Sequence, residues 1–110
     1  MKIKVLKKKD ATVCRVGDEI NIHTIGELNR SFADILKEKP RKALLNLKDV
    51  NYIDSAGLAG VIEFSKKIKA GGGQFFLSDL TLKVRTIMSI TKLNRAFSIF
   101  ETEDDAFKTT

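Results

Sequence analysis

The run from Ala43 to Leu47 constrains the fold more than any other part of this 110-residue chain. Its residues are apolar at successive positions except for Asn46, and further apolar residues follow at Val50, Tyr52 and Ile53. A strand that is apolar on both faces must be covered on both sides, as the central strands of parallel sheets are. The run therefore predicts the centre of a sheet, continued as far as Ile53, with elements packed on both faces.

Strand and helix patterns alternate on either side of this run. Alternating residues around Ile3–Val5 and Thr12–Val16 predict two half-buried strands, an antiparallel hairpin that turns at Lys8–Asp10. Further strands are predicted at Gln74–Leu77 and Phe97–Phe100. Apolar residues at helical spacing predict helices that start after Thr24 and end at Pro40, run from Leu58 to Ala70 before Gly71-Gly72-Gly73, and follow Thr81. The segment Thr102-Glu103-Asp104-Asp105 predicts the start of a short final helix.

The resulting order is ββαβαβαβα. Strands separated by helices of about 12 to 15 residues predict parallel β-α-β crossovers. We therefore expect a single α/β domain over residues 1–110, with a mixed central sheet, an N-terminal antiparallel hairpin and about four helices.

Three helix starts carry capping patterns. Thr24-Ile25-Gly26-Glu27 has the spacing of a capping box, with Thr24 as N-cap and Glu27 reaching back. Thr81 is the expected N-cap of the third helix. Acidic residues at the start of the last helix complement its dipole, and we interpret them as a cap: Glu101, Glu103, Asp104 and Asp105.

The net charge of +6 suggests nucleic-acid binding, because clustered Lys and Arg neutralise phosphates. The basic residues, however, fall at predicted strand and helix ends, and the phenylalanines occupy core positions instead of interleaving with them as stacking platforms. We therefore expect solvated basic faces and no direct nucleic-acid partner. Salt-dependent DNA binding would contradict that interpretation.

Cysteine content and hydropathy indicate the compartment. Cys14 is the only cysteine and lies in an alternating run, so we expect a buried thiol and no disulfide. No stretch approaches the roughly 20 apolar residues of a membrane helix, and the start MKIKVLKKKD is too charged for a signal peptide. We expect a cytoplasmic protein with no membrane partner.

The chain lacks the usual constellations of an enzyme. His23 is the only histidine, so neither a metal site nor a hydrolytic triad is predicted. Gly71-Gly72-Gly73 follows a helix and precedes a strand, whereas phosphate-binding loops lead from a strand into a helix. Ser55 is not in a GxSxG elbow. We expect no catalytic residue, no metal and no cofactor in this chain.

The segment Asp54-Ser55-Ala56-Gly57 stands where the central strand gives way to a helix. Either Asp54 or Ser55 could satisfy the free amides of that helix. Gly57 predicts a close backbone approach or a conformation that side-chain residues avoid. Helix N-terminal amides and the dipole favour an anion, so a phosphate on Ser55 could be accommodated without unfolding the domain.

Here the sequence resembles the anti-sigma factor antagonists of the STAS domain class. The resemblance covers nearly the whole chain and is most specific in ALLNLKDVNYIDSAGLAGVIEF, from Ala43 to Phe64; ITKLNRAFSIFETEDDAF, from Ile90 to Phe107, also matches. In the family pattern, the serine after the second aspartate of this corner is the phosphorylation site. The resemblance implies that this site is Ser55, with Ala56 removing any ambiguity about which serine is modified.

The resemblance implies a bacterial partner-switching phosphoprotein that regulates transcription. Unphosphorylated, such a protein binds an anti-sigma factor that is also a GHKL-type serine kinase, and so releases a sigma factor. The kinase binds ATP and phosphorylates Ser55, which abolishes binding, and a PP2C-type phosphatase reverses the modification. STAS modules also resemble parts of stress-signalling assemblies and accessory subunits of bacterial lipid-transport complexes, which is the alternative function for this chain.

The expected partner surface surrounds Ser55. Family members usually carry Gly-Glu-Leu/Ile-Asp before the first helix, and their aspartate lies close to the serine. This chain has Asn21 there instead, which would remove a repulsive neighbour from a phosphate. The predicted partner-binding residues are Asn21, Thr24, Asp54, Ala56, Gly57, Leu58 and Ala59.

Overall fold

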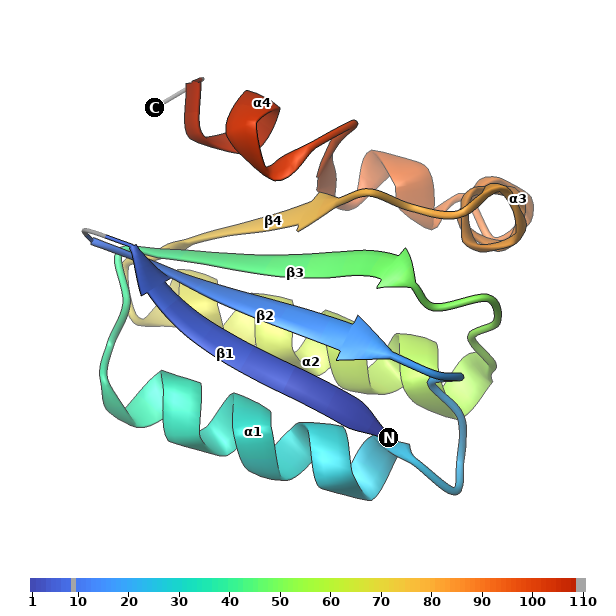
Figure 1. The fold of residues 1–110 in the computed structure, drawn as a ribbon, viewed down its shortest axis with the longest axis horizontal. Helices are drawn as coiled ribbons and strands as arrows, with labels where there is room; N and C mark the ends of the chain where they lie inside the picture. The colour runs from blue at the N-terminus through green and yellow to red at the C-terminus, as the bar shows by residue number, and fades with distance from the viewer. Residues whose placement is uncertain (9, 109–110) are drawn as a thin grey trace.

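The computed structural model describes residues 1–8 and 10–108, and in these residues five strands form one sheet in the order β1-β2-β3-β4-β5 (Figure 1). β1 pairs with β2 in antiparallel fashion, and each later neighbour pairs in parallel. The predicted hairpin and mixed sheet are confirmed. The predicted turn includes Lys9, which lies outside the described residues. The strands are β1 (Lys2–Lys8), β2 (Ala11–Gly17), β3 (Lys42–Asp49), β4 (Gln74–Ser78) and β5 (Ser98–Phe100).

The helices confirm the predicted order ββαβαβαβα. They are α1 (Ile25–Lys37), α2 (Ser55–Ala70), α3 (Leu82–Ile90) and α4 (Glu103–Lys108), with a short 3-10 helix, η1 (Leu93–Arg95), that the sequence did not predict. In Figure 1, α1 and α2 lie side by side beneath one face of the sheet, α4 lies over the opposite face, and α3 lies beyond the carboxyl end of β4. Within residues 1–8 and 10–108, no helix has the length and apolarity needed to cross a membrane.

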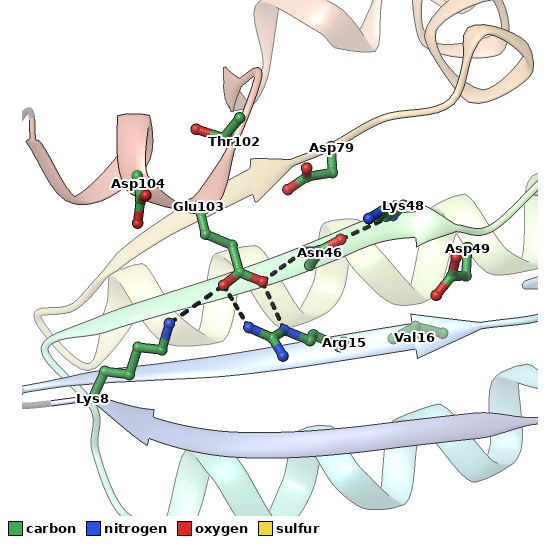
Figure 2. Close-up of a pocket in the computed structure, with 10 residues that line it drawn as sticks. All are labelled: Lys8, Arg15, Val16, Asn46, Lys48, Asp49, Asp79, Thr102, Glu103 and Asp104. Carbon is green, nitrogen blue, oxygen red and sulfur yellow. Dashed lines mark hydrogen bonds and ion pairs between the residues drawn. The ribbon is translucent and has the colours of Figure 1, made fainter.

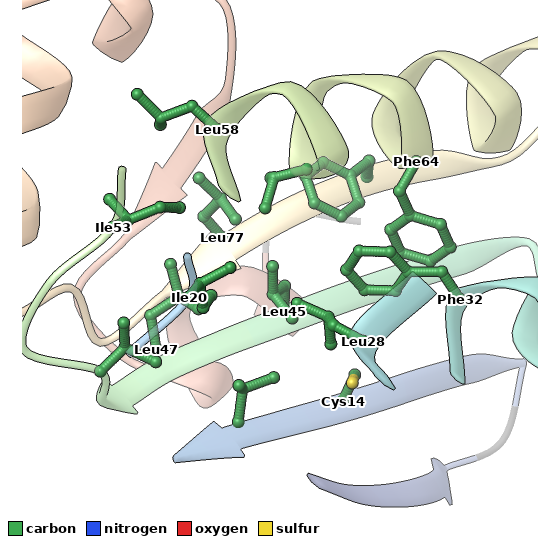
Figure 3. Packing of buried hydrophobic residues seen from close by; sticks show 14 of the residues in the cluster. Cys14, Ile20, Leu28, Phe32, Leu45, Leu47, Ile53, Leu58, Phe64 and Leu77 are labelled. Atoms are coloured by element: carbon green, nitrogen blue, oxygen red, sulfur yellow. The ribbon is translucent and has the colours of Figure 1, made fainter. Parts of the chain in front are cut away.

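Alternate residues of β3 enter two separate cores. Leu45 and Leu47 face α1 and α2 and are fully buried there (Figure 3), whereas Leu44 faces the smaller core that α4 covers. Fully burying a leucine side chain contributes roughly 1.5–3 kcal/mol. In the larger core, the rings of Phe32 and Phe64 stack with their centroids 3.9 Å apart. The two-sided apolar run of β3 is thus explained by burial on both faces.

The predicted continuation of the central strand to Ile53 is wrong. β3 ends at Asp49, and the N–H of Val50 turns back to the carbonyl of Leu47 at 3.0 Å. Tyr52 is 45% exposed, and Ile53 re-enters the core, where it forms an isolated parallel bridge with Ile20. The apolar residues after Asp49 therefore serve a turn and a single bridge instead of one continuous strand.

The predicted capping box at the start of α1 is also wrong. Thr24 has right-handed helical dihedral angles, φ −106° and ψ −20°, and its side chain makes no capping bond to the helix. Its hydroxyl faces the preceding loop, where it donates to the Glu19 carbonyl at 2.7 Å and accepts from the Asn21 N–H at 2.9 Å. The prediction for α3 is confirmed, since the Thr81 hydroxyl accepts from the Val84 N–H at 3.4 Å.

Candidate functional site

Ser55 is the first residue of α2, where the chain has left the carboxyl end of β3 and passed through a short loop. Its side chain is exposed. The Ser55 hydroxyl forms no hydrogen bond with any other described residue, so capping is not its role. The candidate site is therefore an accessible hydroxyl on a helix N-terminus.

Asp54 is the residue that caps α2. Its backbone is extended, and carboxylate oxygen Oδ1 accepts from the Gly57 N–H at 2.8 Å, which satisfies one of the free amides of the first turn. Its second oxygen, Oδ2, accepts from the Ile22 N–H at 3.0 Å. The Asp54 carboxylate therefore binds both the first turn of α2 and the loop between β2 and α1.

Backbone hydrogen bonds also join the loop between β2 and α1 to the loop between β3 and α2. The N–H of Ile20 donates to the Tyr52 carbonyl at 3.1 Å, and the Asp54 N–H donates to the Ile20 carbonyl at 3.1 Å. Asn21 organises its own loop, because its side-chain oxygen accepts from the His23 N–H at 2.8 Å and the Thr24 N–H at 3.1 Å. The surroundings of Ser55 are therefore a fixed surface and not a loose loop.

Gly57 is required by a close backbone approach. A Cβ at this position would lie 2.4 Å from the Ile20 carbonyl oxygen and 2.8 Å from Cγ1 of Ile53. Both distances are shorter than real contacts of a Cβ. The first of the two predicted reasons for this glycine is confirmed: the Ile20–Ile53 bridge fits against α2 only because residue 57 has no side chain.

The predicted partner-binding residues all lie on these two loops and the first turns of α2, but they differ in exposure. Gly57 and Leu58 are buried, Leu58 with 7% of its surface exposed, so they support the corner from inside. Ala59 is exposed, and the remaining four are partly buried: Asn21, Thr24, Asp54 and Ala56. Contact of these residues with a partner stays a prediction.

The chemistry of this edge suits an anion attached to Ser55. The N–H groups of Ser55 and Ala56 are the first two of α2 and have no partner within the helix, and the helix dipole adds partial positive charge there. His23 is exposed on the neighbouring loop. Among the residues that the structure describes, no three His, Cys, Asp or Glu side chains converge as a metal site would require. The arrangement therefore favours a negative charge at Ser55.

A second polar cluster, which the sequence did not predict, lies on the face of the sheet that α4 covers (Figure 2). Glu103, at the start of α4, accepts two hydrogen bonds from Arg15 of β2, each 2.9 Å, and one from Asn46 of β3. Lys8 lies 3.5 Å from the same carboxylate. The Arg15 hydrogen bond is the main reason that the pKa of Glu103 falls from its ordinary 4.5 to about 2. This cluster borders an open hollow of about 560 Å³ and fastens α4 to the sheet.

Cys14 is a buried thiol on β2, as predicted. Burial raises its pKa to about 12, so the reactive thiolate is suppressed. This residue belongs to the larger core, between the sheet and α1, and not to the site.

The chain matches a known family of domains. The model of the STAS domain family matches residues 2–106. A Thermotoga neapolitana protein described as a candidate anti-sigma factor antagonist is 30% identical over 101 residues, 91% of this chain and 89% of that protein. A crystal structure of a Thermotoga maritima protein with the same description has a TM-score of 0.91 and 28% identity, and covers 97% of this chain and 92% of that one.

More distant structures share the fold. The anti-sigma factor antagonist SpoIIAA in its unphosphorylated form has a TM-score of 0.81 at 16% identity, covering 98% of this chain and 95% of that one. Bacillus SpoIIAA in its phosphorylated form has a TM-score of 0.73 at 15% identity, covering 98% of both chains. At these identities the likeness concerns the fold alone.

Proposed function

Because the chain belongs to the STAS domain family, we propose that it is an anti-sigma factor antagonist controlled by phosphorylation of Ser55. Unphosphorylated, it binds an anti-sigma factor that is also a serine kinase, and thereby releases a sigma factor. The phosphorylated form does not bind. The observation that carries this proposal is the exposed Ser55 hydroxyl, unbonded to other described residues, beside an Asp54 that already caps the helix.

The division of labour between Asp54 and Ser55 supports the proposal. A capping serine would hold its hydroxyl against the backbone amide, and phosphorylation would break the cap. Here Asp54 accepts the Gly57 N–H, so Ser55 can be modified while the helix stays capped. Phosphorylation adds a charge of about −1.5 to −2. The free N–H groups of the first turn of α2 reduce the electrostatic cost of this charge within the domain. A partner bound over Ser55 would meet charge repulsion, steric bulk and a desolvation penalty.

The partner supplies the chemistry. A GHKL-type kinase would bind ATP, while this chain acts as the phosphoryl acceptor and not as an enzyme. A PP2C-type phosphatase would restore the hydroxyl. Among relatives with this fold, SpoIIAA has been solved in both unphosphorylated and phosphorylated forms, which establishes two such states for that protein.

Phosphate transfer with purified components tests the proposal. Each GHKL-type serine kinase of the source genome is incubated with this protein and radiolabelled ATP, and the labelled residue is mapped. We expect one kinase to label Ser55. Ser55→Ala should not be labelled and should remain bound, whereas Ser55→Asp should stay folded and bind about a hundredfold more weakly, a loss of about 2.7 kcal/mol.

Ser89 provides the matched control, because it is an exposed serine on α3. Ser89→Ala should be labelled and bound like the parent. Phosphate on a residue other than Ser55, or tight binding of a folded Ser55→Asp, would contradict the proposal. Absence of labelling by every kinase would favour the accessory-subunit alternative.

A further inference from the structure

The hollow beside Glu103 lies on the face of the sheet that α4 covers, towards the carboxyl ends of three parallel strands (Figure 2). We call this space, of about 560 Å³, the polar hollow. Its lining includes Arg15 on β2, Asn46 and Lys48 on β3, and Asp79 directly after β4. Open α/β sheets bind small ligands at the carboxyl ends of their strands, so this is a place where a ligand site is expected.

Two side-chain oxygens on the β4 side of the polar hollow have no partner. Ser78 Oγ and Asp79 Oδ2 are both buried and form no hydrogen bond with any other residue that the structure describes. Ser78 is 0% exposed; it is two residues after Phe76, which packs in the smaller core, so its side chain faces α4 too. Figure 2 shows the Asp79 carboxylate turned towards the hollow. Buried polar atoms are nearly always hydrogen-bonded in native proteins, so these acceptors indicate a place for a donor.

The unpartnered oxygen of Asp79 favours a donor that carries positive charge. A hydrogen bond from an ammonium group to a carboxylate is about twice as strong as one between neutral groups. A metal ion fits less well, because hard cations take about six or more oxygen ligands and no three His, Cys, Asp or Glu side chains converge in residues 1–8 and 10–108. An anion at this end of the hollow would be repelled by Asp79. The chemistry therefore points to a protonated amine.

A positive side chain stands at the strand end beside Asp79. Lys8 and Arg15 already pair with Glu103, at 3.5 and 2.9 Å. Lys48 also lines the hollow but is exposed, and no ion pair joins it to another described residue. Lys48 is two residues after Asn46, and Asp79 is one residue after Ser78, the β4 partner of Asn46. The two opposite charges therefore lie at the ends of neighbouring strands.

We propose that the polar hollow binds a free amino acid, whose ammonium group donates to Asp79 and whose carboxylate pairs with Lys48. This site is separate from Ser55, because α2 lies beneath the other face of the sheet (Figure 1). Thr102 and Asp104 also border the hollow, so the bound molecule contacts the start of α4 as well as the sheet. Solvent screens the charges of an open hollow, so we expect dissociation constants in the millimolar range.

Amide chemical shifts of the isotopically labelled protein test the proposal, with each of the standard L-amino acids titrated separately. We expect at least one of them to shift the amides of Lys48, Asp79 and Thr102 in a saturable way. Two derivatives of the amino acid that binds most tightly then identify the contacts. Its N-trimethylated form keeps the positive charge but has no N–H donor, and it should not bind. Its carboxamide form should bind more weakly than the amino acid.

Substitutions assign each contact to a residue of the protein. Asp79→Asn should weaken binding at least tenfold, and asparagine tolerates the positive φ of 57° at this position. Lys48→Gln should weaken binding of the amino acid at least threefold and leave binding of the carboxamide form unchanged. The control is Asp34→Asn, because Asp34 is an exposed acid on α1, beneath the other face of the sheet. It should bind within twofold of the parent.

Several results would overturn the site. One is that no amino acid shifts these amides. Another is that Asp79→Asn binds as the parent does, or that Asp34→Asn loses as much affinity as Asp79→Asn, which would indicate a response to overall charge alone. Equal binding of the N-trimethylated form would show that no N–H donor is needed. If Asp79→Asn does not fold, as its melting curve would show, Lys48→Gln and the two derivatives still decide the question.

Discussion

The carboxylate of Asp54 accepts the backbone N–H of Ile22 at 3.0 Å while it caps α2 through the Gly57 N–H at 2.8 Å. The two bonds have different consequences. The bond to Gly57 stabilises the helix beneath Ser55, and the bond to Ile22 fixes an exposed apolar residue beside it. Substitutions at Asp54 can therefore separate helix stability from loop order.

We expect Asp54→Ala to lose both bonds and Asp54→Ser to keep the cap alone, because serine is a good N-cap but is too short to hold both partners. Asp54→Ala should lower the free energy of unfolding by about 1–2 kcal/mol. Asp54→Ser should lose less stability but should increase amide hydrogen exchange at Ile22. The His23 amide provides the internal control, since it is bound by Asn21. Slow exchange of the Ile22 amide in Asp54→Ser would show that the loop does not depend on this carboxylate.

A second prediction concerns the close approach at Gly57. In Gly57→Ala, the added Cβ would meet the Ile20 carbonyl oxygen at 2.4 Å, and backbone cannot yield as a flexible side chain can. The start of α2 must shift, and overpacking of this kind typically costs about 1–3 kcal/mol. Chemical denaturation would measure that loss.

Gly26→Ala is the matched control for Gly57→Ala. Gly26 lies in the first turn of α1, and a Cβ there would meet nothing within 4 Å. Alanine is the better helix former by about 1 kcal/mol, so this variant should be slightly more stable than the parent. Equal effects of the two substitutions would mean that the close approach at Ile20 has no energetic weight.

The third prediction concerns Asn21, whose side chain donates to a Glu19 carboxylate oxygen at 3.2 Å and accepts two loop N–H groups. Asn21→Asp would place a negative charge on the loop that Asp54 ties to the Ser55 corner. Two unit charges 4 Å apart interact by about 1 kcal/mol in water, and the phosphate carries more than one. Phosphorylation of Ser55 should therefore lower the melting temperature by several degrees more in Asn21→Asp than in the parent.

The added charge itself must be controlled. Asn29→Asp introduces the same charge at an exposed position of α1 and should leave the effect of phosphorylation unchanged. The difference in Asn21→Asp should shrink as salt is raised, because exposed charges are screened. A phosphorylated Asn21→Asp that melts like the phosphorylated parent would show that residue 21 is electrostatically remote from Ser55.

Patterns that depend on neighbouring residues predicted the fold well. Hydrophobic periodicity located the strands and the first three α-helices, the acidic start at residues 102–105 located α4, and η1 was not predicted. The Asp54-Ser55 corner marked the candidate site. The errors arose where the sequence allows two local structures with similar patterns. Apolar residues at 50, 52 and 53 suit a strand as well as a turn and a bridge, and Thr24 can bond the helix ahead of it or the loop behind it.

Contacts between residues that lie far apart in the chain could not be predicted from the sequence. Glu103 is 88 residues from Arg15 and 57 from Asn46, and no spacing in the chain relates them. The acids at the start of α4 therefore predicted a helix cap, and the partly buried hydrogen bonds of Glu103 to β2 and β3 were not predicted. The exposure of Ile22 and Leu82 was equally hidden, because exposure is a property of the packed chain.

The last prediction uses the anchor that Glu103 provides. Its pKa in the folded protein, about 2, lies below the ordinary value near 4.5, mainly because of the hydrogen bonds from Arg15. A depressed pKa means that the carboxylate stabilises the fold above pH 4.5 and that this contribution is lost as the pH falls from 4.5 towards 2. Each unit between the two values is worth about 1.4 kcal/mol. Because Arg15 is 42% exposed and solvent screens the pair, we expect only about 1–2 kcal/mol from it.

Glu103→Gln should therefore be less stable than the parent at pH 7 and should lose less stability between pH 7 and pH 3. Glu101→Gln is the control, since Glu101 is 78% exposed and its pair with Arg85 lies at the surface; it should follow the pH dependence of the parent. Identical pH dependence of Glu103→Gln and the parent would mean that this carboxylate does not fasten α4.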